Sequence, residues 1–222
     1  MTLLNRRFMT TGLVTSSFIL PLSVTGRSKF ADIALCLSCD VSGSISSEEY
    51  ALQKNGLIKA LTSAMMEEKL KTLSVAMIYH EWSGESKFSD WFLIENIKDA
   101  TSFASEINAF ERSSSSSTEM AKAIQQAILM LNSCPYETGR KVIDVSGDGP
   151  DSNGPAFMPK VIGMAQAFDI RINGLPIIDE SEPNLVEWYE TYVKTGPGSF
   201  IIPANGFSDF ERAMSIKIMG DM

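Results

Sequence analysis

Short apolar runs alternate with longer stretches whose apolar residues recur at helical spacing along most of this 222-residue sequence. The run at residues 33–39 is apolar almost without a break, as expected of a central parallel strand that is covered on both faces. The clearest helical stripe passes through Met120, Ile124 and Leu131. This alternation predicts a doubly wound α/β fold, with a mostly parallel central sheet flanked by helices.

The other expected elements follow the same patterns. Strands are expected at residues 73–79, 91–94, 141–145, 170–177 and 200–202, and helices at 46–69, 101–110, 156–168, 185–194 and from 208 onward. Ser46 with Glu49, and Ser208 with Glu211, have the spacing of a capping box at a helix start. No internal repeat is found, so residues 27–222 are expected to form one domain.

The first 26 residues differ from the rest. Arg6 and Arg7 precede an uncharged stretch at residues 12–24, and small residues follow it. This order is typical of an export signal, so residues 1–26 are expected to be removed and the protein to be periplasmic or secreted. The stretch is short and rich in Ser and Thr for a membrane-spanning helix, although a retained anchor stays an alternative. The export route is left open.

Charge and cysteine content narrow the class of function. The formal net charge of −8 argues against nucleic acid or an anionic membrane as the main partner, because both would repel the protein. Cys36 and Cys39 form a C-x-x-C, which could indicate a redox or zinc site. Residues three apart on a strand point to opposite faces, however, so we expect both thiols to be small buried hydrophobes.

Oxygen-bearing side chains follow two expected strands and precede the striped helix. They are Asp40, Ser42, Ser44, Thr118 and Asp148. Because ligands of open α/β sheets collect at the carboxyl ends of strands, we expect these side chains to meet there. Two carboxylates and three hydroxyls suit a hard cation, Mg²⁺ or Mn²⁺, which prefers oxygen ligands.

The pattern Asp40-x-Ser42-x-Ser44 with Thr118 and Asp148-Gly149 resembles the metal-ion-dependent adhesion site (MIDAS) of the von Willebrand factor A (VWA) family. The resemblance implies a metal-dependent, adhesion-type protein-binding module rather than an enzyme, with an acidic side chain of a partner protein on the metal. Two positions depart from the family pattern: Ser117 stands where Gly often precedes the threonine, and Gly147 stands where the third loop usually has Thr.

A narrower resemblance, to an exported bacterial branch of this family with undefined function, covers most of the chain after residue 26. It rests on four segments, Glu-Trp-Ser-Gly at 81–84, Val-Ile-Asp-Val-Ser-Gly-Asp-Gly-Pro at 142–150, Ile-Asn-Gly-Leu-Pro-Ile at 172–177 and Gly-Pro-Gly-Ser-Phe at 196–200. This branch implies the fold more directly than it implies a partner.

Two other classes of function stay open. Asp148-Gly149-Pro150-Asp151 is similar to a loop of haloacid-dehalogenase-type phosphatases, but those enzymes need an acid/base aspartate two residues after the nucleophile, where this chain has Ser42. A purely structural envelope protein is the other alternative.

Three further side chains have no assigned role at this point. The sole histidine, His80, and Trp82 are each open to a place at the rim of the site or a place in the core, and Asp144 is expected to hydrogen-bond within the sheet or to a loop.

Overall fold

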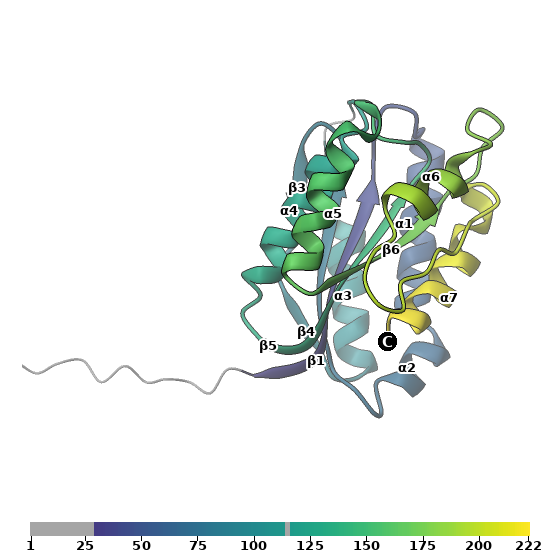
Figure 1. Cartoon of the computed structure of the whole chain (residues 1–222). Helices are drawn as coiled ribbons and strands as arrows, with labels where there is room; N and C mark the ends of the chain where they lie inside the picture. The colour runs from purple at the N-terminus through teal and green to yellow at the C-terminus, as the bar shows by residue number, and fades with distance from the viewer. Residues whose placement is uncertain (1–28, 114–115) are drawn as a thin grey trace, which may run out of the picture.

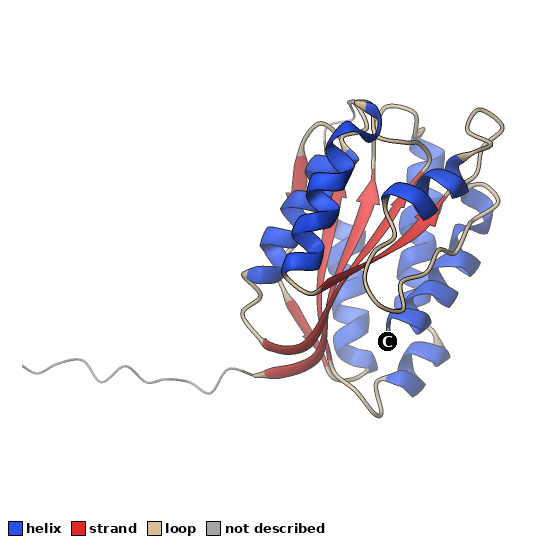
Figure 2. Ribbon diagram, viewed as in Figure 1, coloured by secondary structure: helices blue, strands red, loops and turns tan. Residues whose placement is uncertain are grey.

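The computed structural model describes residues 29–113 and 116–222, and the expected export signal, residues 1–26, lies outside them. A six-stranded sheet lies between two layers of helices (Figure 2). Its order is β3-β2-β1-β5-β6, with β4 also pairing with β2. The strands are β1 (Phe30–Asp40), β2 (Val75–Trp82), β3 (Ser86–Phe88), β4 (Phe92–Ile94), β5 (Glu137–Gly147) and β6 (Ile170–Pro176).

The centre of the sheet is parallel, as the sequence predicts. β1 pairs in parallel with β2 on one side and β5 on the other, and β5 pairs in parallel with β6. Only the short strands β3 and β4 run antiparallel to β2. Parallel strands need crossover connections, which the helices supply, and this explains why β1 and β2 are apolar and buried on both faces.

The helices cover both faces of the sheet (Figure 1). They are α1 (Ser47–Leu61), α2 (Ala64–Lys69), α3 (Ile97–Ala109), α4 (Met120–Asn132), α5 (Met158–Ala167), α6 (Leu185–Tyr192) and α7 (Phe210–Asp221), with single 3₁₀ turns at Gly154–Phe157 and Phe207–Asp209. α1, α3 and α7 pack in one core cluster with Cys39, whereas α4, α5 and α6 pack in the other with Cys36. Both thiols are therefore buried, free and on opposite faces, as expected.

Helix boundaries depart from expectation at three places. α3 begins at Ile97, four residues earlier than expected, because Asn96 caps it. The capping box of Ser46 and Glu49 is present, but the helix that it begins ends at Leu61. α2 then starts anew, because the Ser63 hydroxyl caps it by accepting the Met66 N–H. The second expected cap is wrong: Ser208 lies inside a 3₁₀ turn, so its hydroxyl is not at the cap position of α7.

The expected last strand is also wrong. Residues 195–204 form only isolated bridges beside β6, antiparallel at Thr195 and parallel at Ile201. The direction changes because the chain turns between these bridges at Gly196 and Gly198, which both have positive φ. A segment that reverses direction in this way cannot form a continuous ladder.

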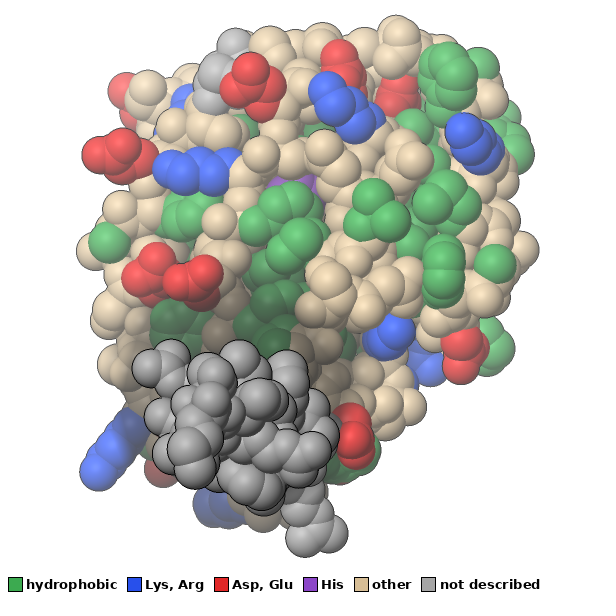
Figure 3. Space-filling view, turned by 90° about the vertical axis from the view of Figure 1, so that its left-hand side faces the viewer, with side chains coloured by type: hydrophobic (Ala, Val, Ile, Leu, Met, Phe, Trp, Pro, Cys, Tyr) green, Lys and Arg blue, Asp and Glu red, His purple; other side chains and the backbone are tan. Residues whose placement is uncertain are grey.

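None of the helices in the described parts of the chain is long and apolar enough to cross a membrane. On the face at the β3 edge of the sheet, acidic and basic side chains are interspersed with apolar ones (Figure 3).

Candidate metal centre

The carboxyl ends of β1 and β5 lie side by side and bring two of the predicted side chains together. The two strands are register neighbours up to Cys39 and Ser146, so Asp40 and Asp148 follow at the same edge of the sheet. The loop after β1 then returns toward β5, and the Ser44 hydroxyl donates a hydrogen bond to Asp148 Oδ1 at 3.0 Å. This edge, at the top of Figure 1, is where the predicted site lies.

Asp40 is fully buried, and only one of its two carboxylate oxygens has a hydrogen-bond partner. Its Oδ1 accepts the Ser42 N–H at 2.8 Å, whereas its Oδ2 has no hydrogen-bond partner. Burial, and secondarily the nearby Asp148 carboxylate, raise the pKa of Asp40 to about 7. A buried carboxylate without a cation is costly, so this position favours a positive charge beside Oδ2.

A row of hydroxyls connects Asp40 with Asp148. The Ser42 hydroxyl is 3.3 Å from the Ser44 hydroxyl, and Ser44 in turn donates to Asp148. Burial raises the pKa of Asp148, and the Ser44 hydrogen bond opposes that shift. The four side chains thus form one continuous group of oxygen atoms.

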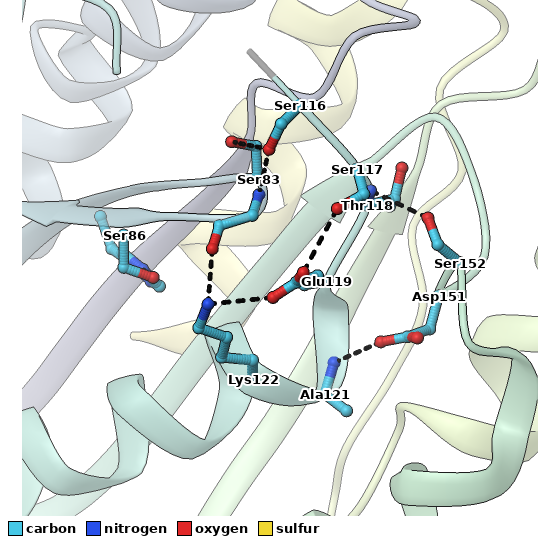
Figure 4. A network of polar contacts seen from close by, with 12 residues as sticks. Ser83, Ser86, Ser116, Ser117, Thr118, Glu119, Ala121, Lys122, Asp151 and Ser152 are labelled. Atoms are coloured by element: carbon cyan, nitrogen blue, oxygen red, sulfur yellow. Dashed lines mark hydrogen bonds and ion pairs between the residues drawn. The ribbon is translucent and has the colours of Figure 1, made fainter. Parts of the chain in front are cut away.

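Thr118 reaches the same edge from the segment before α4. It lines a cavity of about 490 Å³ together with Ser44 and Asp148. Its backbone is held by Ser152: the Thr118 N–H donates to Ser152 Oγ at 3.0 Å, and its carbonyl accepts the Ser152 N–H at 2.8 Å (Figure 4). The cap position of α4 is Glu119, so Thr118 is not a helix cap.

Asp151 links the third loop to α4 (Figure 4). Its Oδ2 accepts the Ala121 N–H at 2.8 Å, and its Oδ1 accepts the Asn153 N–H at 2.8 Å. Because both oxygens accept backbone N–H groups, Asp151 serves α4 as a cap supplied from another loop. This is a structural role for the aspartate that made the phosphatase resemblance attractive.

Arg112 is a residue that the sequence reasoning missed. Its Nη2 donates to the carbonyls of Val41, Ser42 and Ile45, at 3.2, 3.4 and 2.8 Å respectively. The Gly43 N–H also donates to the Ser116 carbonyl at 2.8 Å. The segment between α3 and α4 therefore shapes the loop that carries Ser42 and Ser44. An arginine next to a serine run is no distinctive sequence signal, so the contact could not be foreseen.

Glu81 also fixes the segment between α3 and α4, through a hydrogen bond to Ser113. Its Oε1 accepts the hydroxyls of Tyr50 and Tyr79, at 2.6 and 3.0 Å, and its Oε2 accepts the Ser113 N–H at 2.9 Å. Glu81 is fully buried, so this network is a fixed part of the interior rather than a solvated rim.

The three residues with open roles all lie in the interior. His80 lies between the hydroxyls of Ser38 and Ser86, at 2.9 and 3.0 Å, and burial lowers its pKa to about 3, so it is neutral. Trp82 is completely buried in the core. Asp144 forms an ion pair with Lys217 of α7 at 2.8 Å, with both side chains fully buried. None of the three lies at the rim of the candidate site.

The donor set fits a hard divalent cation. Among the described residues, no group of three or more His, Cys, Asp or Glu side chains is placed to hold a metal ion, so a cation at this edge would need the hydroxyls as ligands. Hydroxyls and two carboxylates, one of them with an unpartnered buried oxygen, are instead the chemistry that Mg²⁺ and Mn²⁺ accept.

Comparison with known proteins gives a family and a fold. Residues 30–222 match the family model described as "Protein of unknown function (DUF1194)". A comparison with curated proteins gives no match.

Solved structures match over most of this chain. A von Willebrand factor type A protein from Catenulispora acidiphila is 10% identical over 86% of this chain and 42% of its own, with a TM-score of 0.60. The pilus adhesin SpaC from Lactobacillus rhamnosus GG is 13% identical over 85% of this chain and 31% of its own, with a TM-score of 0.61.

Proximal thread matrix protein 1 from the mussel byssus, with a zinc-occupied MIDAS motif, is 14% identical over 86% of this chain and 46% of its own, with a TM-score of 0.54. This chain therefore spans less than half the length of each of these proteins. At these identities the likeness shows the fold, which is that of VWA domains.

Proposed function

This chain belongs to the DUF1194 family and has the VWA fold, and on that premise we propose that it is an exported, metal-dependent protein-binding module. Asp40, Ser42, Ser44, Thr118 and Asp148 would hold Mg²⁺ or Mn²⁺, directly or through water. The bound cation supplies an electrophilic position that accepts a carboxylate of a partner protein. Residues 1–26 would be the export signal, which gives a periplasmic or extracellular location.

One observation carries the proposal: a buried carboxylate oxygen of Asp40 has no partner beside a row of hydroxyls that ends at Asp148. A purely structural edge of the sheet would satisfy that oxygen with a donor or replace it with an apolar group. The likeness to a pilus adhesin and to a byssus protein with a zinc-occupied MIDAS motif supports the same function.

Acidic side chains at the rim of the cavity lead us to expect that partner binding depends strictly on the bound cation. Glu49, Asp179 and Glu182 line it in addition to Asp148. In the absence of a cation, this negative field would repel an acidic partner side chain. With the cation in place, the field attracts basic residues beside that side chain. We therefore expect a partner segment that carries an acidic residue flanked by Lys or Arg.

The test is a calorimetric titration of Mg²⁺ and Mn²⁺ into chelator-treated protein. We expect one site in the wild type and its loss in Asp40→Asn, which keeps the shape of the side chain but removes the charge. Asp90→Asn is the matched control, because Asp90 is exposed and its carboxylate has no hydrogen bond or ion pair among the described residues. Equal metal affinity in wild type and Asp40→Asn would exclude the site.

A further inference from the structure

A second hollow lies at the opposite end of the sheet from the candidate metal centre. It is bounded by the amino-terminal parts of β5 and β6 and by the loop that contains Gly196, and its volume is about 290 Å³. Because β5 and β6 are parallel, this end is separated from Asp148 by the length of β5. The hollow is thus distinct from the cavity beside Ser44 and Thr118.

Positive charge converges on this hollow. Arg140 and Lys141 of β5 and Arg171 of β6 line it, and Asp169 is the one carboxylate among its lining residues. The whole chain has a net charge of −8, so a local excess of cations is contrary to its overall composition. Val142 is the register partner of Arg171, and Arg140 precedes Val142 by two residues. Both arginines therefore emerge on one face of the sheet, whereas Lys141, between Arg140 and Val142, points to the other face, toward Asn132 of α4.

The loop beside β6 holds the Arg171 side chain in place. Gly196 and Gly198 have φ of +89° and +72°, and a Cβ atom at Gly198 would lie only 3.2 Å from Arg171 Nη2. The guanidinium therefore lies close to a backbone that has no side chain there. The Arg171 side chain nevertheless makes no hydrogen bond or ion pair with any described residue. Its N–H donors therefore have a defined position but no acceptor among the described residues.

Arg140 is oriented by contacts that leave donors free. One of its nitrogens, Nη2, donates to the backbone oxygens of Asp221 and Met222, both at 2.9 Å. A guanidinium has five N–H donors, so Arg140 keeps donors for a ligand.

We propose that this hollow binds the phosphate group of a small ligand. Two arginines against one aspartate leave a net positive charge of +1 on this face, which attracts the anionic phosphate group of a phosphate ion or a phosphate monoester. Guanidinium groups pair with tetrahedral oxyanions through parallel N–H donors. The volume is at the small end of the range for ligand sites, which favours a compact ligand over an extended one.

The test is a titration of the full chain with inorganic phosphate and with methyl phosphate, in the presence of a chelator so that the metal centre plays no part. We expect saturable binding at one site by the wild type. Arg171→Gln and Arg140→Gln, tested separately, should each weaken it by about tenfold or more, because each removes charge-assisted hydrogen bonds. Thermal denaturation checks that both variants are folded.

Lys98→Gln is the matched control, since it removes the same charge from α3, on the other side of the molecule from β6, and should leave phosphate affinity unchanged. Failure of the wild type to bind phosphate, or equal weakening by Lys98→Gln, would overturn the proposal. A second arm uses phosphatidylcholine vesicles with and without phosphatidic acid. We expect no retention on either, because the acidic protein is repelled by an anionic surface. Retention that Arg171→Gln abolishes would overturn the assignment to a soluble ligand.

Discussion

At the scale of single residues, Gly147 determines where Asp40 can lie. A Cβ atom at this position would be 2.9 Å from Asp40 Oδ2, 3.0 Å from Asp40 Cβ and 3.1 Å from the Tyr189 hydroxyl. These contacts are shorter than van der Waals distances, so a side chain there would force Asp40 to move. The absence of a side chain at Gly147 thus leaves space for the buried Asp40 carboxylate.

We therefore expect Gly147→Ala to weaken Mg²⁺ binding and to lower the free energy of unfolding by about 1–3 kcal/mol through overpacking. Calorimetry and urea denaturation measure the two effects. Gly149→Ala is the control, since a Cβ there would meet nothing within 4 Å. If both variants behave alike, Gly147 does not position Asp40.

At the scale of elements, the candidate site is formed by three loops that are hydrogen-bonded to one another. The sequence identified the carboxyl ends of β1 and β5 because the aspartates directly follow apolar runs, and it identified α4 from its stripe. It could not identify Arg112 or Asp151 in their roles, because both act on backbone groups far away in the chain. Ser208 misled for the opposite reason: its spacing to Glu211 is right, but a 3₁₀ turn precedes the helix.

The contact of Arg112 with the loop after β1 gives a prediction at this scale. Arg112→Lys keeps the charge but cannot donate to three carbonyls from one planar group. We expect the dissociation constant of Mg²⁺ to rise by about tenfold, as calorimetry would measure.

Arg212→Lys is the control for that substitution, because Arg212 is exposed and pairs with Asp209 at the start of α7. An unchanged Mg²⁺ affinity in Arg112→Lys would show that the loop keeps its shape without the guanidinium.

At the scale of the whole molecule, α7 is anchored to the middle of the sheet by charge as well as by apolar packing. Lys217 reaches Asp144 of β5 at 2.8 Å with both side chains fully buried. Asp221 lies beside them, and burial raises its pKa to about 8 although Lys217 opposes the shift. Asn173 of β6 also donates to Asp221 Oδ1 at 2.5 Å. This polar cluster connects the last helix with two neighbouring strands.

Lys217→Met should lower the free energy of unfolding by about 3–5 kcal/mol, because it leaves Asp144 buried without a cation. The double variant Lys217→Met with Asp144→Leu should recover much of that loss, since Asp144 no longer needs a cation and burial keeps Asp221 largely protonated at pH 7 by raising its pKa. Urea denaturation measures both. Lys59→Met removes an exposed partner of Glu211 and should cost about 1 kcal/mol or less; a similar value for Lys217→Met would contradict the buried pair.

The ion pair between β5 and α7 also affects the order in which parts of the chain fold during synthesis. During synthesis Asp144 leaves the ribosome before Lys217, because β6 and α6 lie between these two residues in the sequence. An unfinished chain can therefore bury the middle of β5 only by leaving a carboxylate without its cation, which is strongly unfavourable. Completion of the sheet is thus deferred until the last helix has been synthesised.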